Sequence, residues 1–96
     1  MIIRSVRHRG LRRLLAEDDD RLLKLGLASR VRKSLTILVL ADEMDEFLAD
    51  APPGWHVDRL SGKRRKEWSV SVSGNWRITF KEKNGHIYDL NLEDYH

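Results

Sequence analysis

The sequence predicts an α+β fold, in which an antiparallel sheet has its apolar face covered by two or three helices from the N-terminal half. Apolar side chains fall on every second residue through most of 68–96, which is the period of strands. Upstream, leucines recur at the three- and four-residue spacing of helices. Ninety-six residues have room for one small core, so we expect a single domain over residues 1–96.

The N-terminal residues begin with a brief apolar alternation that predicts a short strand over 2–6. Residues 7–16 carry Leu11, Leu14 and Leu15 at helical spacing, and an acidic block follows at 17–20. Acidic side chains at a helix C-terminus oppose the helix dipole. We therefore expect the block to lie in a loop, with Asp20 as the N-cap of the next helix.

A second helix is predicted over 21–41, with Gly26 as a point of interruption. Its apolar stripe consists of Leu27, Val31, Leu35, Leu38 and Val39. Asp42 then fits the cap of a last helical turn, in which Met44, Phe47 and Leu48 share a face. The run Ala-Pro-Pro-Gly at 51–54 ends that helix, because proline cannot continue it.

Residues 55–60 are predicted to add a strand, and 61–67 form a basic connection into a three-stranded meander. The strands of the meander are separated by Ser-Gly-Asn at 73–75 and Asn-Gly at 84–85, residues that accept the positive φ of hairpin turns. Joining apolar residues across the hairpins predicts the pairs Val72 with Trp76, Val70 with Ile78, and Ile78 with Leu90. The apolar face would then also hold Trp68, Tyr88 and Leu92.

The opposite face of the meander is polar, and there Ser71, Arg77 and Asn91 are predicted to lie roughly opposite one another. One arginine would thus occupy the middle of the sheet, where its guanidinium can meet solvent or a ligand. Because Trp68 and Trp76 are in phase with apolar neighbours, we expect both to pack in the core rather than to stack on bases.

The charge distribution is segregated, although the net charge is only +3. Arginines crowd residues 4–13 and cations crowd 59–66, whereas acidic residues cluster at 17–20 and 42–50. Such segregation suits a polyanionic partner, although it is equally typical of a solvated surface. The chain has no cysteine, no signal-peptide pattern and no apolar run near the ~20 residues of a membrane span, so we expect a cytoplasmic protein without a membrane partner.

Metal and cofactor chemistry find no support in the sequence. The four histidines show no metal-ligand spacing, and there is no glycine-rich phosphate loop or G-x-S-x-G motif. We therefore expect neither a metal nor a cofactor.

The residues left for chemistry are Arg77, the basic run before the meander, and the terminal Glu93-Asp94-Tyr95-His96. Histidine exchanges protons near neutral pH, and a neighbouring aspartate can orient its ring. Metal-free RNA cleavage needs such acid–base groups and cations beside the developing phosphorane charge. A terminal histidine can equally be a frayed end, and unbroken alternation would turn Asp94 and His96 toward the core. Their convergence with Arg77 predicts a bulge or bend near Glu93.

The C-terminal half resembles the HigB-type toxins of the RelE superfamily. The likeness is carried by L-S-G at 60–62, W-S-V at 68–70, N-W-R-I-T-F at 75–80 and the closing E-D-Y-H at 93–96, and the helical half fits in order and length. It implies a RelE-like fold and the toxin of a type II toxin–antitoxin pair. Such toxins cut messenger RNA in the ribosomal A site without a metal, and a HigA-like antitoxin with a helix-turn-helix domain neutralises them.

The resemblance also implies roles for individual residues. Arg77 would stabilise the scissile phosphate, Asp94 and His96 would belong to the catalytic set, and Tyr95 would orient or stack on the substrate. Arg64 would contact phosphate from the basic loop, which Arg59, Lys63 and Lys66 extend as RNA-binding residues. Several relatives have lysine where this chain has Ser61, and Lys63 or Arg59 is the candidate to replace that charge.

Two other functions remain open on the sequence alone. In the first, the chain is a non-catalytic RNA- or ribosome-binding module whose basic residues contact phosphates. In the second, it is a protein-interaction domain that binds through its helices or a sheet edge. The sequence does not indicate a codon preference, an antitoxin docking surface or an oligomeric state.

Overall fold

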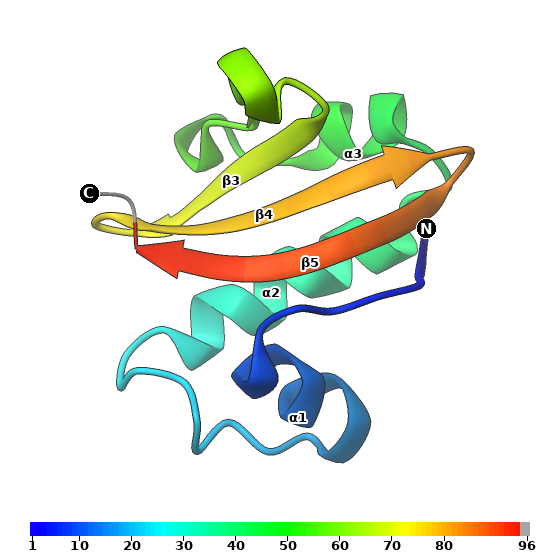
Figure 1. The fold of residues 1–96 in the computed structure, drawn as a ribbon. Coiled ribbons are helices and arrows are strands. Elements are labelled where there is room, and N and C mark those ends of the chain that lie inside the picture. Colours follow the sequence, from blue (N-terminus) through cyan, green and yellow to red (C-terminus); the bar gives the residue numbers. More distant parts are fainter. Residues whose placement is uncertain (95–96) are drawn as a thin grey trace.

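The computed structural model describes residues 1–94 as a five-stranded sheet with three helices on one face (Figure 1). The strands lie in the order β1-β5-β4-β3-β2, and only the β1–β5 pair is parallel. The strands are β1 (Ile2–Ile3), β2 (Asp58–Arg59), β3 (Glu67–Ser73), β4 (Trp76–Lys83) and β5 (His86–Asp94). The helices are α1 (Arg9–Glu17), α2 (Ala28–Leu40) and α3 (Met44–Asp50), with short 3-10 turns η1 (Pro53–Trp55) and η2 (Gly62–Arg64). The predicted α+β architecture is confirmed.

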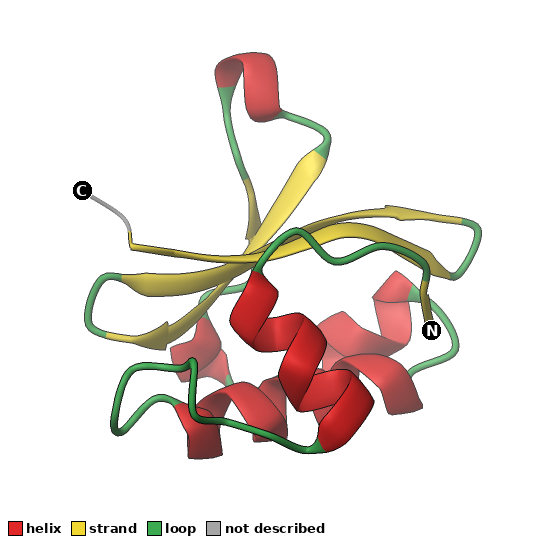
Figure 2. Cartoon of the chain, turned by 60° about the horizontal axis from the view of Figure 1, so that its bottom comes forward, coloured by secondary structure: helices red, strands yellow, loops and turns green. Residues whose placement is uncertain are grey.

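The helices lie on one side of the sheet and η2 projects from the other (Figure 2). The core is the layer between the helices and the apolar sheet face. There Phe47 of α3 meets Phe80 of β4 edge to face, with ring centroids 6.4 Å apart. Trp68 and Trp76 are half-buried against this core, as predicted. The opposite surface of the sheet, which we call the polar face, is not covered by these helices.

The first helix begins two residues later than predicted, at Arg9, because His8 caps it. The His8 Nδ1 accepts a hydrogen bond from the Leu11 amide at 3.2 Å. Burial, together with the positive charge of Arg12, lowers the pKa of His8 and so favours the neutral ring that can accept this bond. Upstream of the helix, the predicted strand over 2–6 is reduced to β1 and an isolated parallel bridge between Val6 and Leu90.

The second helix is shorter than predicted, because it begins at Ala28 instead of residue 21. Gly26 has φ +90°, a left-handed conformation that cannot continue a helix, and residues 20–27 form turns. Asp20 is therefore not the N-cap, a position that Leu27 holds without a side-chain hydrogen bond. Asp20 instead pairs with Arg32 on α2, with 3.6 Å between the charged atoms.

The third helix ends before Pro52 as predicted, but Glu43, and not Asp42, holds its N-cap position. The Asp42 amide donates to the Glu46 carboxylate, which reaches back from the first turn. Three residues expected on apolar helix faces are also exposed: Leu15 at 42%, Val39 at 45% and Leu48 at 40%. None of these helices, within the part of the chain that the structure describes, is long and apolar enough to cross a membrane.

The predicted strand over 55–60 is wrong in its first half. Pro53–Trp55 is a 3-10 turn, and His56 at φ +46° separates it from the two-residue strand β2. Because two prolines lie just before this segment, only a short edge strand forms.

The meander forms with two bulges that change the predicted register. Val70 pairs with Ile78 as predicted, but Ser73, not Val72, pairs with Trp76, since Val72 is the extra residue of a bulge in β3. In the second hairpin, Ile78 pairs with Leu92 and not with Leu90.

The shift in β5 arises at Asp89, which has φ +54°. Thr79 pairs with Asn91 and Lys81 with Tyr88, so two residues of β5, Asp89 and Leu90, face the single residue Phe80 of β4. The bulge changes the alternation: Ile87 is buried in the core with 0% exposure, and Tyr88, predicted in the apolar stack, is 38% exposed.

Candidate functional site

The polar face places Arg77 in the middle of the meander, as predicted. Its Cα partners are Ser71 on β3 and Glu93 on β5, so Glu93 occupies the place that the sequence assigned to Asn91. The guanidinium donates to the Ser69 hydroxyl at 3.1 Å, and Ser69 itself is fully buried. Arg77 is half-buried, so its charge is held at a fixed place on the surface.

Arg64 reaches this face from η2. Gly62 lets the chain turn sharply there, with φ +64°. The Arg64 guanidinium binds two carboxylates: its Nε and Nη2 lie 2.8 and 3.0 Å from Glu67, and its Nη1 and Nη2 lie 3.0 and 2.6 Å from Glu93. The Thr79 hydroxyl donates to the same Glu93 carboxylate. We call Arg64, Glu67 and Glu93 the carboxylate clasp.

The clasp shifts the acidity of its members in the directions expected for ion pairs. Hydrogen bonds from Arg64 lower the pKa of Glu67 and of Glu93, against the opposing effect of burial. The same bonds raise the pKa of Arg64. Both carboxyl groups are thus ionised at neutral pH. The clasp ties η2 to the start of β3 and to the end of β5.

A cavity of about 200 Å³ opens between the clasp and Arg77. It is lined by Leu60, Arg64, Ser69, Arg77, Thr79, Glu93 and Asp94. Three of the predicted site residues, Arg64, Arg77 and Asp94, therefore meet at one hollow. A phosphate-sized group entering it would meet the Arg77 guanidinium beside ionised carboxylates.

The bulge that we predicted near Glu93 is absent from the described residues, so alternation places Asp94 on the face of Trp76 and not on the face of Arg77. Pairing between β4 and β5 is regular from Asn91 to Asp94, and Asp94 pairs with Trp76 at the end of the sheet. Asp94 is exposed at this end of the sheet, and the residue lines both the cavity beside Arg77 and a second hollow of about 390 Å³ that includes Lys24. Tyr95 and His96, the other predicted catalytic residues, lie outside the described residues.

Of the predicted RNA-binding cations, Arg64 alone lines the cavity. Arg59 lies over the Trp68 ring, 4.7 Å from its centroid, and donates to the Arg65 carbonyl at 3.3 Å. Lys63 and Lys66 are exposed in and just after η2. We call the exposed residues Arg59, Lys63, Arg65 and Lys66 the basic rim. The rim supplies the surplus positive charge, since the clasp neutralises Arg64.

Sequence reasoning missed Glu67 and Glu93 as partners of Arg64. A signal was present for each: Glu67 follows Arg64 at a three-residue spacing, and Glu93 shares the parity of Asn91, which we had placed beside Arg77. Within residues 1–94, no three acidic, histidine or cysteine side chains gather closely enough to hold a metal ion.

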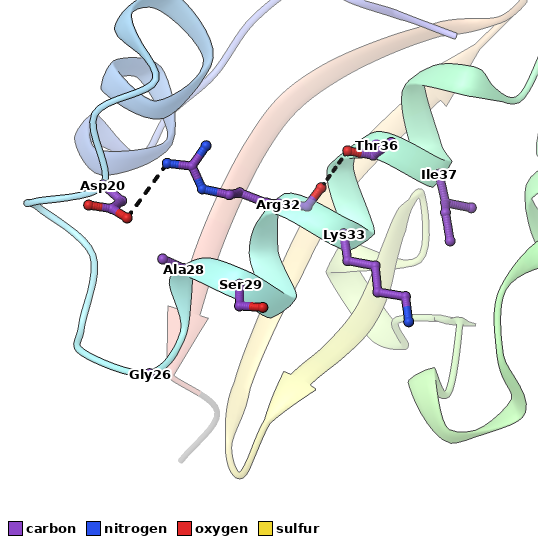
Figure 3. Close-up of a pocket in the computed structure, with 8 residues that line it drawn as sticks. All are labelled: Asp20, Gly26, Ala28, Ser29, Arg32, Lys33, Thr36 and Ile37. Carbon is purple, nitrogen blue, oxygen red and sulfur yellow. Dashed lines mark hydrogen bonds and ion pairs between the residues drawn. The ribbon is translucent and has the colours of Figure 1, made fainter.

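A larger hollow, of about 830 Å³, lies over α2 and the loop before it (Figure 3). There Arg32 points toward Asp20, and the Thr36 hydroxyl donates to the Arg32 carbonyl at 2.8 Å. The hollow belongs to the helical layer, and none of the predicted site residues within 1–94 lines it. Its size alone does not make it the better candidate.

The sequence was also compared with known proteins. Residues 4–96 match the family described as the RelE-like toxin of the type II toxin–antitoxin system HigB. The endoribonuclease HigB of Proteus vulgaris is 34% identical over 95 residues, which cover 99% of this chain and 100% of that protein.

Proposed function

The chain belongs to the family of RelE-like HigB toxins from type II toxin–antitoxin systems, and from this membership and the polar-face cavity we propose that it is an endoribonuclease that cuts messenger RNA. The observation that carries the proposal is that Arg77 and Asp94 border one cavity on the polar face. A guanidinium can stabilise a charged phosphorane, and a carboxylate at the same end of the sheet can take part in proton transfer.

We assign the chemical roles as follows. The Arg77 guanidinium would bind the scissile phosphate and stabilise the charge that builds on it. Asp94 and His96 would move protons between the 2′-hydroxyl, solvent and the leaving 5′-oxygen, and Tyr95 would orient or stack on the substrate. The carboxyl groups of the clasp stay ionised, so neither Glu67 nor Glu93 would be the acid. The reaction would need no metal.

RNA would approach across the basic rim. Arg59, Lys63 and Lys66 would contact phosphates outside the cavity, where their charges are exposed. Lys63 or Arg59 would replace the cation that relatives carry at the place of Ser61. Arg64 would contact phosphate only by exchanging one of its carboxylate partners for it, because four hydrogen bonds already engage its guanidinium.

The partners follow from the same assignment. A type II system implies an antitoxin, for which we propose a HigA-like protein with a helix-turn-helix domain. We further propose that the ribosome presents the messenger RNA in its A site, which would place the protein in the cytoplasm.

The experiment that tests this function is induction of the chain in a bacterial host, with the 5′ ends of messenger RNA mapped before and after. We expect growth arrest and new ends within codons. Arg77→Ala and deletion of His96 should each relieve the arrest and remove the new ends while leaving a soluble, folded protein. Arrest without new ends would show a binding module, and unchanged toxicity of the folded variants would refute the assigned site.

A further inference from the structure

The bulge at Asp89 gives the polar face a second feature, at the end of the sheet away from η2. Lys81 pairs with Tyr88 and Lys83 with His86, so all four side chains lie on the face that carries Arg77 and Thr79. Without the extra residue, Tyr88 would point into the core. Bulges often turn a side chain toward a site in this way.

Two aromatic rings meet at this place in a fixed arrangement. The His86 and Tyr88 rings are stacked, with centroids 6.5 Å apart and an angle of 29° between their planes. The Arg4 Nε donates to the His86 Nδ1 at 2.7 Å, so the segment after β1 holds the His86 ring in place. Tyr88 is nonetheless 38% exposed. We call Arg4, Lys83, His86 and Tyr88 the Tyr88 platform.

The charges around the platform are mostly positive. Arg4, Lys81 and Lys83 are exposed, and Lys81 pairs with the Asp89 carboxylate at 3.4 Å. Proteins that bind single-stranded nucleic acid often present an exposed aromatic ring with cations near it, because the ring stacks on a base and the cations contact the phosphates.

The platform is continuous with the cavity. Arg77 and Lys81 lie on the same face of β4, four residues apart, which is about 13 Å along a strand. Arg7 lies between the two places on the neighbouring N-terminal segment, where its positive charge helps to lower the pKa of Glu93. A strand of RNA with a phosphate at Arg77 could therefore run along β4 and β5 to Tyr88.

We propose that the Tyr88 platform binds an unpaired base of single-stranded RNA by stacking, with Arg4 and Lys83 contacting the adjoining phosphates. The proposal rests on the proposed function, since it takes the RNA to lie across Arg77. The base belongs either to messenger RNA beside the cut or to ribosomal RNA. Both present the same chemistry, a π face with flanking phosphates.

The test measures binding separately from cleavage. Fluorescently labelled full-length protein is titrated with ribosomes that carry messenger RNA made uncleavable by 2′-O-methyl groups, with ribosomes that carry none, and with the free RNA. Wild type, Tyr88→Ala and Tyr88→Phe are compared, with Leu40→Ala as the control for loss of an exposed apolar side chain on the helical layer. Circular dichroism checks the fold of each.

Tyr88→Ala should weaken binding about 5- to 150-fold, the range for loss of one base–aromatic stack, whereas Tyr88→Phe and Leu40→Ala should bind as wild type does. A loss confined to programmed ribosomes or free RNA identifies messenger RNA, and an equal loss on empty ribosomes identifies ribosomal RNA. Unchanged binding by Tyr88→Ala overturns the proposal, as does an equal loss with Tyr88→Phe, which would show that the hydroxyl matters and not the ring.

A second measurement keeps the proposal testable if Tyr88→Ala does not fold. Abasic substitutions are placed one at a time in the uncleavable RNA bound to wild type, and in parallel to His86→Ala. If the base belongs to messenger RNA, one abasic position should weaken wild-type binding and weaken His86→Ala binding less, because the variant has already loosened the stack. If every abasic position is neutral, the base is ribosomal, and His86→Ala should then bind ribosomes that carry no messenger RNA more weakly than wild type does. The proposal fails if every abasic position is neutral and His86→Ala also binds those ribosomes with wild-type affinity.

Failure of this proposal is distinguishable from failure of the proposed function. If the protein binds RNA through Tyr88 but makes no new ends in messenger RNA, the platform proposal stands and the proposed nuclease function fails. If cleavage is normal and Tyr88→Ala binds RNA as wild type does, the proposed nuclease function stands and the platform proposal fails.

Discussion

At the scale of single residues, Arg64 is the side chain whose role the structure changes most. The sequence presents it as one of several cations in a basic run. In the fold it is an ion-pair centre that joins η2 to both ends of the meander through Glu67 and Glu93. Bidentate contacts of this kind favour arginine over lysine, because the planar guanidinium matches the carboxylate.

Arg64→Ala should lower the free energy of unfolding at neutral pH by about 1 kcal/mol or somewhat more, since hydrogen bonds to charged groups are lost but the side chain is 44% exposed. The effect should depend on pH. Glu67 and Glu93 have folded-state pKa values lowered from 4.5, so their stabilisation is complete above that pH and is lost as the pH falls through the folded values.

Urea denaturation of wild type and Arg64→Ala from pH 2 to 7 would check this expectation. The two stability curves should separate above about pH 4.5 and converge in acid. Arg64→Lys is the matched control, because it keeps the charge without the fork and should lie between them. Curves that stay parallel over the whole range would show that the carboxylates owe their acidity to other groups.

At the scale of elements, the bulge in β5 decides which side chains the meander presents. Asp89 holds a left-handed backbone conformation, and its amide donates to the Ser5 hydroxyl at 2.8 Å. The Leu90 amide donates to the Ser5 carbonyl at 3.1 Å. The N-terminal segment thus supports the bulge from the side opposite β4.

Asp89→Val should destabilise the fold by about 1–2 kcal/mol, because a β-branched residue is strained at φ +54°. Asp89→Gly is the control: it loses the same ion pair with Lys81 but accepts the conformation. Thermal melts of both proteins measure the difference. If the glycine variant is as unstable as the valine variant, the ion pair and not the backbone conformation matters at this position.

At the scale of the whole molecule, the two faces of the sheet have separate tasks. The helices cover one face and make the core (Figure 2), and the other face carries Arg77, the clasp and the Tyr88 platform. The basic rim lies at the end of the sheet, in and next to β2 and η2. The edge strands β1 and β2 have only two residues each, which limits unwanted pairing with other chains.

This segregation predicts a salt-dependent affinity for single-stranded RNA. If Arg59, Lys63, Lys66 and Arg77 each meet one phosphate, the logarithm of the binding constant should fall with the logarithm of salt concentration with a slope of about −3. Lys66→Gln should make the slope shallower by about 0.7, and Lys33→Gln on the helical layer should not change it. Fluorescence anisotropy at several salt concentrations measures the slope, and a value near zero would exclude binding through the rim.

The sequence by itself determined the fold class, the order of the main elements and the position of Arg77 on the polar face. These follow from hydrophobic period, turn residues and proline, which act locally along the chain. The family likeness was also readable there, in motifs such as N-W-R-I-T-F at 75–80.

Only the tertiary structure decided the start of α2, the register of β5 and the partners of Arg64. Each of these choices has alternatives of similar local energy. The helix can kink or end at Gly26, the strand can be regular or bulged at Asp89, and the Arg64 guanidinium can be solvated or paired. The choice depends on groups distant in the sequence, such as Ser5 beside Asp89 and Glu93 beside Arg64. Such contacts exist only after the chain has folded, so a local pattern cannot contain them.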